Sequence, residues 1–304
     1  MITRRRFIQY LGATIASGLS MGGYAVAVEP NLPARVRRYR LTPTGWPKGL
    51  RLRIVALADF HACRPWMSPE RISKIVDLAN DLSPDVTVLL GDYERGMKFL
   101  NQELEPHEWA TPLGRLTAPH GVHAILGNHD WYEDKKSVWG KKGPCRAIAA
   151  LQAAGLNVLD NESSRIEVAG QGVWLAGLGD QFAFHKNGRW GRHDMDATLA
   201  RINNDDEPVI LLAHEPDIFP VAPERISLTL SGHCHGGQVR LFGWAPYIPS
   251  KFGNRYGYGH IVENDRHLIV SGGLGCSKLP IRIGVPPEVL LIEVGEDDVT
   301  SVKA

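Results

Sequence analysis

Five short apolar segments constrain the fold of this 304-residue chain more than any other feature. Each segment ends in a small residue followed by polar ones, and they read RIVALADFH, VTVLLGDY, GVHAILGNHD, PVILLAHE and ISLTLSGHCH. Short continuous apolar runs of this kind are typical of strands that are buried on both faces. We therefore expect five buried strands.

Segments with helical spacing lie between several of these runs. In SPERISKIVDLANDLSP, Ser68 can cap a helix, Pro69 suits its first turn and Pro84 stops it. Three further helices are expected, over residues 107–116, 144–154 and 194–202. The alternation of strands and helices predicts an α/β fold. Because no linker rich in Gly, Ser or Pro divides the chain after residue 50, residues 50–304 are expected to form one domain.

Some strand candidates fall outside simple β-α alternation. They read RIEVAG, GVWLAGLGD, LIVSGGLG and EVLLIEV, and they indicate a second sheet. Residues 28–49 form a lead-in segment that contains four prolines and a basic run from Arg35 to Arg40. This segment could be an extended connection or a solvated edge strand, and its composition favours the edge strand.

Polar side chains follow the apolar runs at the points where the strands end. They are Asp59, His61, Asp92, Asn128, His129, Asp130, His214, His233 and His235. Because ligands bind at the carboxyl ends of strands in open α/β sheets, we expect these residues to meet. Two of them, Asp59 and His61, are two residues apart, as are His233 and His235, so each pair projects from one side wherever the chain stays extended.

The number of ligand-type residues indicates two metal ions. One tetrahedral zinc ion takes about four ligands, whereas the strand ends offer more oxygen and nitrogen donors than that. Two ions about 3.5–4 Å apart that share a carboxylate would use the larger set. The residues therefore predict a dinuclear site.

The order of the blocks D-x-H, G-D, G-N-H-D, a lone His after an apolar strand, and G-H-x-H resembles the calcineurin-like metallophosphoesterase superfamily. The blocks cover residues 59 to 235. The later stretches HGGQVRLFG and GLGCSKLPIRIGVPPEVLLIEV are similar to a branch of exported or membrane-associated phosphodiesterases. The resemblance implies a four-layer α-β-β-α sandwich of two mixed β-sheets.

The resemblance also implies roles for individual residues. One divalent ion would be held by Asp59, His61, Asp92 and His235, and the other by Asp92, Asn128, His214 and His233. His129 would stabilise the transferred phosphoryl group or protonate the leaving oxygen. The mixed imidazole and carboxylate ligands suit Mn, Fe, Zn, Co or Ni.

One departure from the family pattern concerns the group that orients His129. Many relatives carry G-D-x-x-D, but here Arg95 stands where the second Asp would be. Either Glu94 or Asp130 takes over the orienting role, or His129 works without such a group and Arg95 contacts the substrate phosphate.

The N-terminus has the form of an export signal. Residues Thr3 to Gln9 resemble the twin-arginine consensus, and the stretch from Ala13 to Val28 carries no charge. Ala25-Val26-Ala27 has the small-x-small form of a cleavage site, which predicts removal of residues 1–27 as a signal peptide. The alternative is an uncleaved membrane anchor, because the apolar stretch approaches spanning length.

Together these features predict a phosphodiesterase that acts in the periplasm or at the outer face of the cytoplasmic membrane. Its partners would be the twin-arginine export machinery and a small-molecule or lipid-linked phosphoester. The alternatives are a pyrophosphohydrolase acting on a lipid-linked or nucleotide-sugar diphosphate, and a non-catalytic metal-binding module. With a formal charge of +1 and no long basic block in the body of the chain, nucleic acid is not an expected partner.

Two further features leave alternatives open. The aromatic stretch LFGWAPYIPSKFGNRYGYGH could contact an acyl chain or a base above the site, giving peripheral membrane contact, or could pack against the sheet edge. Cys63 and Cys234 each adjoin a ligand block, so they could approach one another and form a disulfide or remain two buried thiols.

Overall fold

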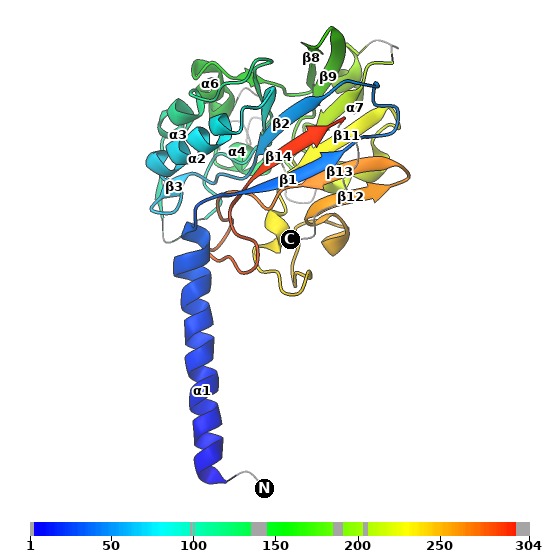
Figure 1. Cartoon of the computed structure of the whole chain (residues 1–304). Helices are drawn as coiled ribbons and strands as arrows, with labels where there is room; N and C mark the ends of the chain where they lie inside the picture. Colours follow the sequence, from blue (N-terminus) through cyan, green and yellow to red (C-terminus); the bar gives the residue numbers. More distant parts are fainter. Residues whose placement is uncertain are drawn as a thin grey trace.

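Two mixed β-sheets form the centre of the molecule, as the computed structural model shows for residues 3–97, 99, 101–134, 145–184, 191–202 and 206–295 (Figure 1). The first sheet has the order β1 (Arg35–Leu41), β14 (Glu288–Val294), β2 (Leu52–Leu57), β4 (Val86–Leu89), β6 (Val122–Ala124) and β7 (Asn157–Val158). The second has the order β12 (Gly259–Glu263), β13 (Arg266–Val270), β11 (Ile226–Ser231), β10 (Val209–Leu212), β9 (Gln171–Gly177) and β8 (Glu162–Val168). A short antiparallel pair joins β3 (Cys63–Arg64) to β5 (Gln102–Glu103).

Parallel pairing dominates the middle of both sheets. In the first sheet β2, β4, β6 and β7 are parallel, while β14 runs antiparallel to β2 and parallel to the edge strand β1. In the second sheet β9, β10, β11 and β13 are parallel, and β8 and β12 close the two edges in antiparallel fashion. The carboxyl ends of the five predicted central strands therefore share one edge of the molecule.

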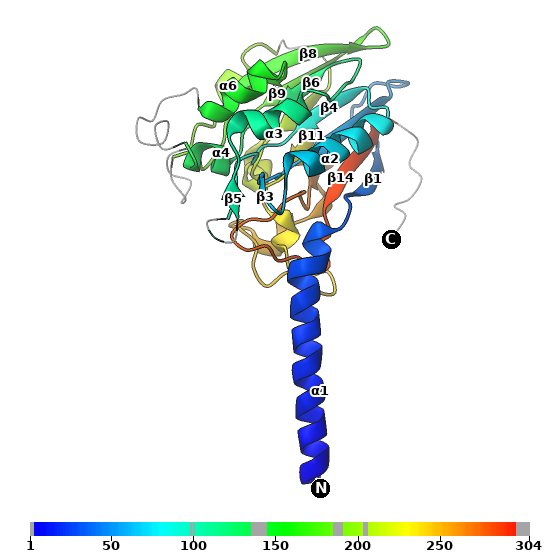
Figure 2. The same ribbon diagram turned by 90° about the vertical axis from the view of Figure 1, so that its left-hand side faces the viewer.

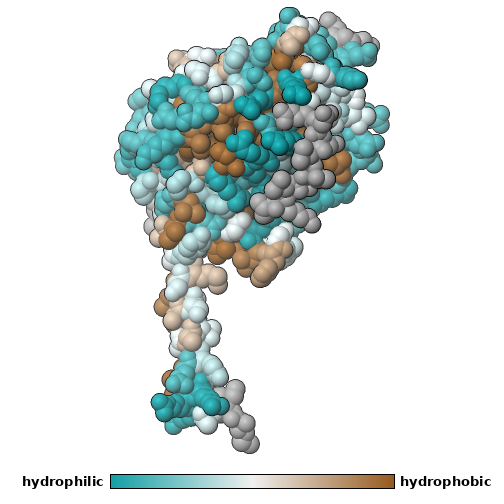
Figure 3. All heavy atoms as spheres, viewed as in Figure 1, coloured by the Kyte–Doolittle hydropathy of each residue, from teal (hydrophilic) through white to brown (hydrophobic). Residues whose placement is uncertain are grey.

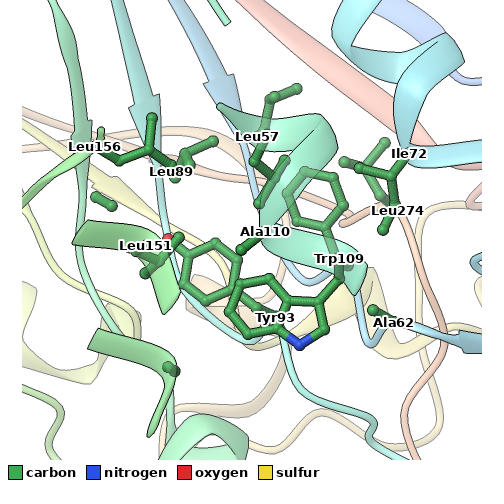
Figure 4. Close-up of a cluster of buried hydrophobic side chains, with 14 of the residues drawn as sticks. Leu57, Ala62, Ile72, Leu89, Tyr93, Trp109, Ala110, Leu151, Leu156 and Leu274 are labelled. Carbon is green, nitrogen blue, oxygen red and sulfur yellow. The ribbon is translucent and has the colours of Figure 1, made fainter. Parts of the chain in front are cut away.

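Strand β2 shows how the residues build the layers. Leu52, Ile54 and Ala56 enter the core between the two sheets, where they meet residues such as Leu212 and Leu230 of the second sheet. The alternate residues of β2, such as Val55 and Leu57, enter a separate core beneath the helices, because successive side chains of a strand point to opposite faces. Figure 4 shows part of this second core, including Leu57, Tyr93 and Trp109.

Helices cover the outer face of each sheet. Helices α2 (Pro69–Asp81), α3 (Pro106–Leu113) and α6 (Arg146–Ala153) pack on the first sheet (Figure 2). The outer face of the second sheet is covered by α7 (Met195–Leu199) and the 3-10 helix η3 (Pro216–Val221). The expected four-layer arrangement of two mixed sheets is therefore confirmed.

The predicted helices are correct in place but too long. Ser68 caps α2, its Oγ accepting from the backbone N–H of Arg71 at 3.4 Å. Gly114 and Ala200 lie at the C-caps of α3 and α7, so both helices end before the predicted residues 116 and 202. The described residues also include the short helices α4 (Asn128–Tyr132), η4 (His235–Gly237) and η5 (Gly253–Tyr256). Of the prediction over 144–154, residue 144 lies outside the described residues.

The N-terminal segment forms a helix that projects away from the body (Figure 1). Helix α1 (Arg4–Gly23) continues into a π-helical turn, η1 (Tyr24–Val28), and a 3-10 turn, η2 (Glu29–Asn31). This 28-residue helical stretch has a mean hydropathy of 1.4 in its most apolar window and is long and apolar enough to cross a membrane. A cleaved export signal can have the same length and hydropathy. The cleaved signal peptide and the uncleaved membrane anchor therefore both stay predictions for residues 1–27.

The four cysteines are free and buried. Of the two alternatives for Cys63 and Cys234, two buried thiols is the one confirmed, because Cys63 packs with Met97 and Cys276 while Cys234 belongs to a different cluster around Phe219.

Candidate metal centre

The predicted site residues lie in loops that directly follow the central strands. Strand β2 ends at Leu57 before Asp59, β4 ends at Leu89 before Asp92, and β11 ends at Ser231 before His233. Likewise β6 precedes Asn128 and β10 precedes His214. The edge formed by the strand ends therefore gathers all seven predicted metal ligands and His129 in one region.

The backbone of these loops is not extended, contrary to the expectation for the D-x-H and H-x-H pairs. Five ligand residues adopt left-handed conformations, with φ of +56° at Asp59, +45° at His61, +58° at Asp92, +65° at His233 and +50° at His235. Non-glycine residues reach this region at a cost and tend to cluster there at functional sites. Each strand ends before its predicted ligands. The side-chain directions of the D-x-H and H-x-H pairs are therefore set by the turns that follow the strands, and not by the alternation of side chains along an extended strand.

Asp59, His61 and His235 form the first group of converging ligand atoms. One donor atom from each lies within 4.8 Å of the other two, and all three residues are buried. The two imidazole Nε2 atoms of His61 and His235 are 2.9 Å apart. Nε2 of His235 lies 3.5 Å from Oδ1 of Asp59.

Asp92, His214 and His233 form the second group, again with one donor atom each within 4.8 Å of the others. Asn128 joins this group, because its Oδ1 lies 2.9 Å from Nδ1 of His233. The two predicted ligand sets are thus reproduced as two neighbouring clusters, with His235 in one and His233 in the other. Their roles as ligands remain a prediction.

Asp92 lies between the two clusters. Its Oδ2 is 3.2 Å from Nε2 of His214 and 3.5 Å from Nε2 of His61. Its Oδ1 accepts a hydrogen bond from the backbone N–H of His129 at 2.8 Å. One carboxylate oxygen therefore reaches donor atoms of both groups, which is the position that a bridging ligand must have.

Backbone carbonyls fix which nitrogen faces the centre in three of the imidazoles. Nδ1 of His61 lies 3.1 Å from the carbonyl oxygen of Glu94, and Nδ1 of His214 lies 2.7 Å from that of Leu90. A ring that donates from Nδ1 leaves the lone pair of Nε2 free for a metal ion. In His233 the roles are reversed, since Nε2 lies 2.9 Å from the carbonyl oxygen of Pro249 and Nδ1 faces Asn128.

Burial and mutual charge shift the pKa values of this cluster strongly. Burial raises the pKa of Asp59 to about 7 and lowers the pKa of His61 to about 3. Burial also acts to raise the pKa of Asp92, but the neighbouring imidazoles of His214, His129 and His61 together outweigh it and hold that pKa well below its usual range. The neutral imidazole of His61 and the carboxylate of Asp92 are the forms that bind divalent cations.

The arrangement fits a pair of divalent metal ions. Oδ2 of Asp59 is buried and has no hydrogen-bond partner in the described structure. Buried polar atoms are rarely left in this state unless they bind an ion, water or substrate. The mixed imidazole, carboxylate and amide donors suit first-row transition metals.

His129 lies beside the two clusters, on the first turn of α4. Its imidazole packs edge-on against that of His61, with ring centroids 4.9 Å apart. Nε2 of His129 is 3.5 Å from Oγ of Ser277, and the side chain is only partly buried. The ring is therefore accessible to a substrate held at the metal ions.

The residues considered for orienting His129 have other partners. Glu94 forms a bidentate ion pair with Arg146, at 2.9 and 2.8 Å. The Asp130 carboxylate accepts four backbone N–H groups, from residues 92, 93, 94 and 127. Arg95 forms ion pairs with Glu103 at 3.1 Å and Glu133 at 3.3 Å, which hold its guanidinium against those carboxylates.

Asp130 instead holds the backbone that carries Asp92. Gly127 must approach this backbone closely, because a Cβ atom on Gly127 would lie 2.3 Å from Oδ1 of Asp92. The Asp130 carboxylate and the missing side chain at residue 127 together fix the position of the bridging residue.

Arg282 is a buried cation beside the candidate site that the sequence did not reveal. Its guanidinium is fully buried and donates to the carbonyl oxygens of Gly272, Gly275 and Val285. Nη2 lies 3.4 Å from Nδ1 of His235, so this cation braces the loop behind a predicted ligand. Arg282 stands in the ordinary-looking stretch LPIRIGVPP, among 34 basic residues, and only its flanking prolines and glycine hinted at a fixed loop.

Comparison with known proteins places this geometry in a family. Residues 52–262 match the family described as calcineurin-like phosphoesterase. The chain is 30% identical over 299 residues to a protein named "Uncharacterized metallophosphoesterase YkuE" from Bacillus subtilis, covering 95% of this chain and 96% of that protein. It is also 30% identical over 299 residues to "Phosphodiesterase YaeI" from Escherichia coli, covering 97% and 100%.

A bovine relative named "Transmembrane protein with metallophosphoesterase domain" is 30% identical over 295 residues, which are 92% of this chain but only 60% of that protein. The two candidate ligand clusters and the matched family agree on metal-dependent hydrolysis of phosphoester bonds. The chain belongs to the calcineurin-like phosphoesterase family and is a hydrolase of phosphoesters.

Proposed function

We propose that this protein is a phosphodiesterase that works outside the cytoplasmic membrane after export by the twin-arginine machinery. The observation that carries the catalytic part is the position of Asp92, whose Oδ2 lies within 3.5 Å of imidazole nitrogens from both ligand groups. The similarity to the relative named phosphodiesterase supports the diester as substrate.

In this proposal the protein holds two divalent ions drawn from Mn, Fe, Zn, Co and Ni. The first ion has the ligands Asp59, His61, Asp92 and His235, and the second has Asp92, Asn128, His214 and His233. When bound, the ions acidify water and neutralise phosphoryl charge. The low pKa of His61 and the low pKa of Asp92 keep the ligand atoms of these two residues free of protons at neutral pH.

His129 is the proposed catalytic residue. Its backbone N–H is fixed by Asp92, and its partly exposed imidazole faces the space next to His61. From there the imidazole can stabilise the phosphoryl oxygens or give a proton to the leaving oxygen.

A substrate panel tests the catalytic proposal. Protein purified without added metal is analysed for its elements and then supplied with a nitrophenyl phosphodiester, the matching monoester and a nucleotide-sugar diphosphate. We expect about two ions per chain and fastest turnover of the diester, abolished by a chelator and restored by metal. Faster turnover of the diphosphate supports the pyrophosphohydrolase instead, and no turnover in fully metallated protein contradicts both.

The export proposal rests on Thr3 to Gln9 and is tested separately. Arg4 and Arg5 occupy the paired positions of the consensus, while Arg6 occupies its variable position. Replacing both Arg4 and Arg5 by Lys should retain the protein in the cytoplasm, whereas Arg6→Lys should leave export intact. Equal export of both variants, measured by cell fractionation, contradicts the twin-arginine route.

A further inference from the structure

Large apolar side chains are exposed on one face of the body, next to the root of α1. Outside the helical stretch 4–31, eight such side chains are exposed among the described residues, and six of them belong to three loops: Phe99, Leu241, Phe242, Trp244, Tyr247 and Leu279. Only Val221 and Val262 lie elsewhere. We call the six residues the apolar face. The surfaces of soluble monomeric proteins rarely carry large exposed apolar side chains gathered in one place.

Backbone contacts bring the first two loops of the apolar face together. Gly96 and Ser277 form a β-bridge, and the N–H of Lys278 donates to the carbonyl oxygen of Gly96 at 3.1 Å. Phe99 and Leu279 therefore extend from neighbouring pieces of backbone.

The third loop is joined to the same segment. The N–H of Arg240 donates to the carbonyl oxygen of Ile283, and the N–H of Ile283 donates to that of Gln238, both at 2.8 Å. Nζ of Lys278 lies 3.1 Å from the hydroxyl of Tyr247. These contacts hold the loop containing Phe242 and Trp244 beside Leu279.

The turns η1 and η2, which continue α1 toward the body, are hydrogen-bonded to the same region. The N–H of Arg282 donates to the carbonyl oxygen of Ala25 at 2.9 Å, and the N–H of Val285 donates to Oε1 of Glu29 at 2.8 Å. Ala25 and Glu29 are each only 3% exposed. In Figure 3 apolar atoms are visible on the lower side of the body, beside the point where α1 leaves it.

We propose that the apolar face contacts a lipid bilayer that α1 spans, on the side of the membrane where the body lies. In this proposal α1 is retained as a membrane anchor. A 20-residue helix is about 30 Å long, which matches the hydrocarbon core of a bilayer. Arg4, Arg5 and Arg6 at its far end favour the cytoplasmic side, which leaves the body on the opposite side. The apolar face is continuous with the end of this helix, so a spanning α1 brings the face to the headgroup layer.

The composition of the face fits a membrane interface. Phe242 is fully exposed at 108%, and Trp244 and Tyr247 are the side chains that favour the boundary between hydrocarbon and headgroups. The exposed Lys278 adds a cation that attracts anionic lipids. Cleavage after Ala27 would remove the Ala25 carbonyl that Arg282 binds, which favours retention of α1.

The metal centre lies directly behind the apolar face. Ser277, at 3.5 Å from His129, precedes Leu279 in the same loop, and Pro249, which contacts His233, follows Tyr247. Phosphoesters in the lipid headgroup layer would therefore reach the catalytic residues with little displacement. The docking surface depends on the proposed location outside the membrane and not on the identity of the substrate.

Spin labels at single positions test the proposal on the full chain. Phe242→Cys places a label on the apolar face, and Val221→Cys places a matched label on the exposed end of η3. The native cysteines are buried, and burial raises the pKa of Cys63 to about 11 and that of Cys145 to about 12, so they react slowly. The parent chain carried through the same labelling reaction verifies this.

The labelled chains are reconstituted into vesicles of phosphatidylethanolamine and phosphatidylglycerol, and label depth is measured from collisions with oxygen and with a water-soluble nickel chelate. We expect the label at 242 to lie about 5–10 Å below the headgroup surface and the label at 221 to remain in water. Equal nickel accessibility at both positions overturns the proposal. Dipolar broadening between labels at 242 also overturns it, because a second copy of the chain would then cover the face.

Hydrolysis of the soluble nitrophenyl diester by the same vesicles separates this proposal from the proposed function. If the diester is cleaved while the label at 242 stays in water, the docking surface is wrong and the function stands. If the label at 242 is buried in the bilayer but the diester is not cleaved, the docking surface stands and the proposed phosphodiesterase function is wrong. The intact mass of the membrane-extracted protein must include residues 1–27. A mass that lacks these residues contradicts the retained anchor.

Discussion

Replacing Asp130 by Asn should destabilise both the fold and the metal centre. Oδ1 of Asp130 accepts the N–H groups of Tyr93 and Glu94 at 2.8 and 3.0 Å, and Oδ2 accepts those of Asp92 and Gly127 at 3.0 and 2.8 Å. An asparagine has one oxygen and one NH2 group, so whichever way the amide turns, two backbone donors face another donor.

The magnitude follows from the two donors left unsatisfied. Each buried unsatisfied group costs about 1–3 kcal/mol, so the substitution should lower the free energy of unfolding by about 2–6 kcal/mol. For a chain of this size about 1 kcal/mol corresponds to about 2 °C or slightly more, so the melting temperature should fall by at least about 4 °C. Burial raises the pKa of Asp130 to about 7, so the comparison is made near pH 8, where the wild-type side chain is ionised.

The assay is thermal unfolding of metal-loaded protein, with Asp194→Asn as the matched control. Asp194 caps α7 by accepting the N–H of Ala197 at 2.9 Å, and Asn caps helices about as well as Asp. The control should therefore change the melting temperature little. If Asp130→Asn melts within about 1 °C of the control, the assignment of Asp130 as the support of the Asp92 backbone is refuted.

Three further predictions concern the metal centre. His129→Ala should reduce diester turnover by about 10²–10⁴-fold with little change in metal content, and parallel loss of both contradicts its role beside the metals. Gly127→Ala should lower metal content and turnover together, measured by elemental analysis and rate assays, because the new Cβ would lie 2.3 Å from Oδ1 of Asp92. The control Gly18→Ala, whose Cβ would meet nothing within 4 Å, should leave both quantities unchanged. Since burial raises the pKa of Asp59 to about 7, its proton must leave before metal binds; metal affinity in calorimetric titrations should fall about tenfold per pH unit below pH 7, and a flat profile contradicts this.

Strand ends and ligand order were predictable from the sequence because each depends on a local pattern. The apolar runs before Asp59, Asp92 and His214 form β2, β4 and β10, and the parallel arrangement then brings their ends together. The second sheet was indicated by apolar segments such as EVLLIEV, although that segment forms β14 of the first sheet and joins the edge strand β1. Which sheet a strand enters depends on long-range pairing that the local pattern does not contain.

The backbone geometry of the ligand loops could not be predicted. Asp and His enter the left-handed region more readily than most non-glycine residues, but the local sequence does not mark which of them do so, and Asp59 and His61 adopt it in the folded loops. Arg282 was hidden for a similar reason, since its burial depends on carbonyl groups of residues 272, 275 and 285 that fold around it. The helices were overextended because α3 and α7 have their C-caps at Gly114 and Ala200, which the spacing of apolar residues does not mark.

The left-handed backbone at the predicted ligands would restrict how a metal centre built from them can change its metal preference. Asp, Asn and His are the non-glycine residues that enter that backbone region most readily, so exchanges among them at Asp59, His61, Asp92, His233 and His235 keep the loops in place. A Cys or Glu ligand introduced there would oppose the backbone as well as alter the coordination. Asn128 and His214 have ordinary backbone angles, so an engineer or a diverging lineage can introduce new ligand chemistry at these two positions first.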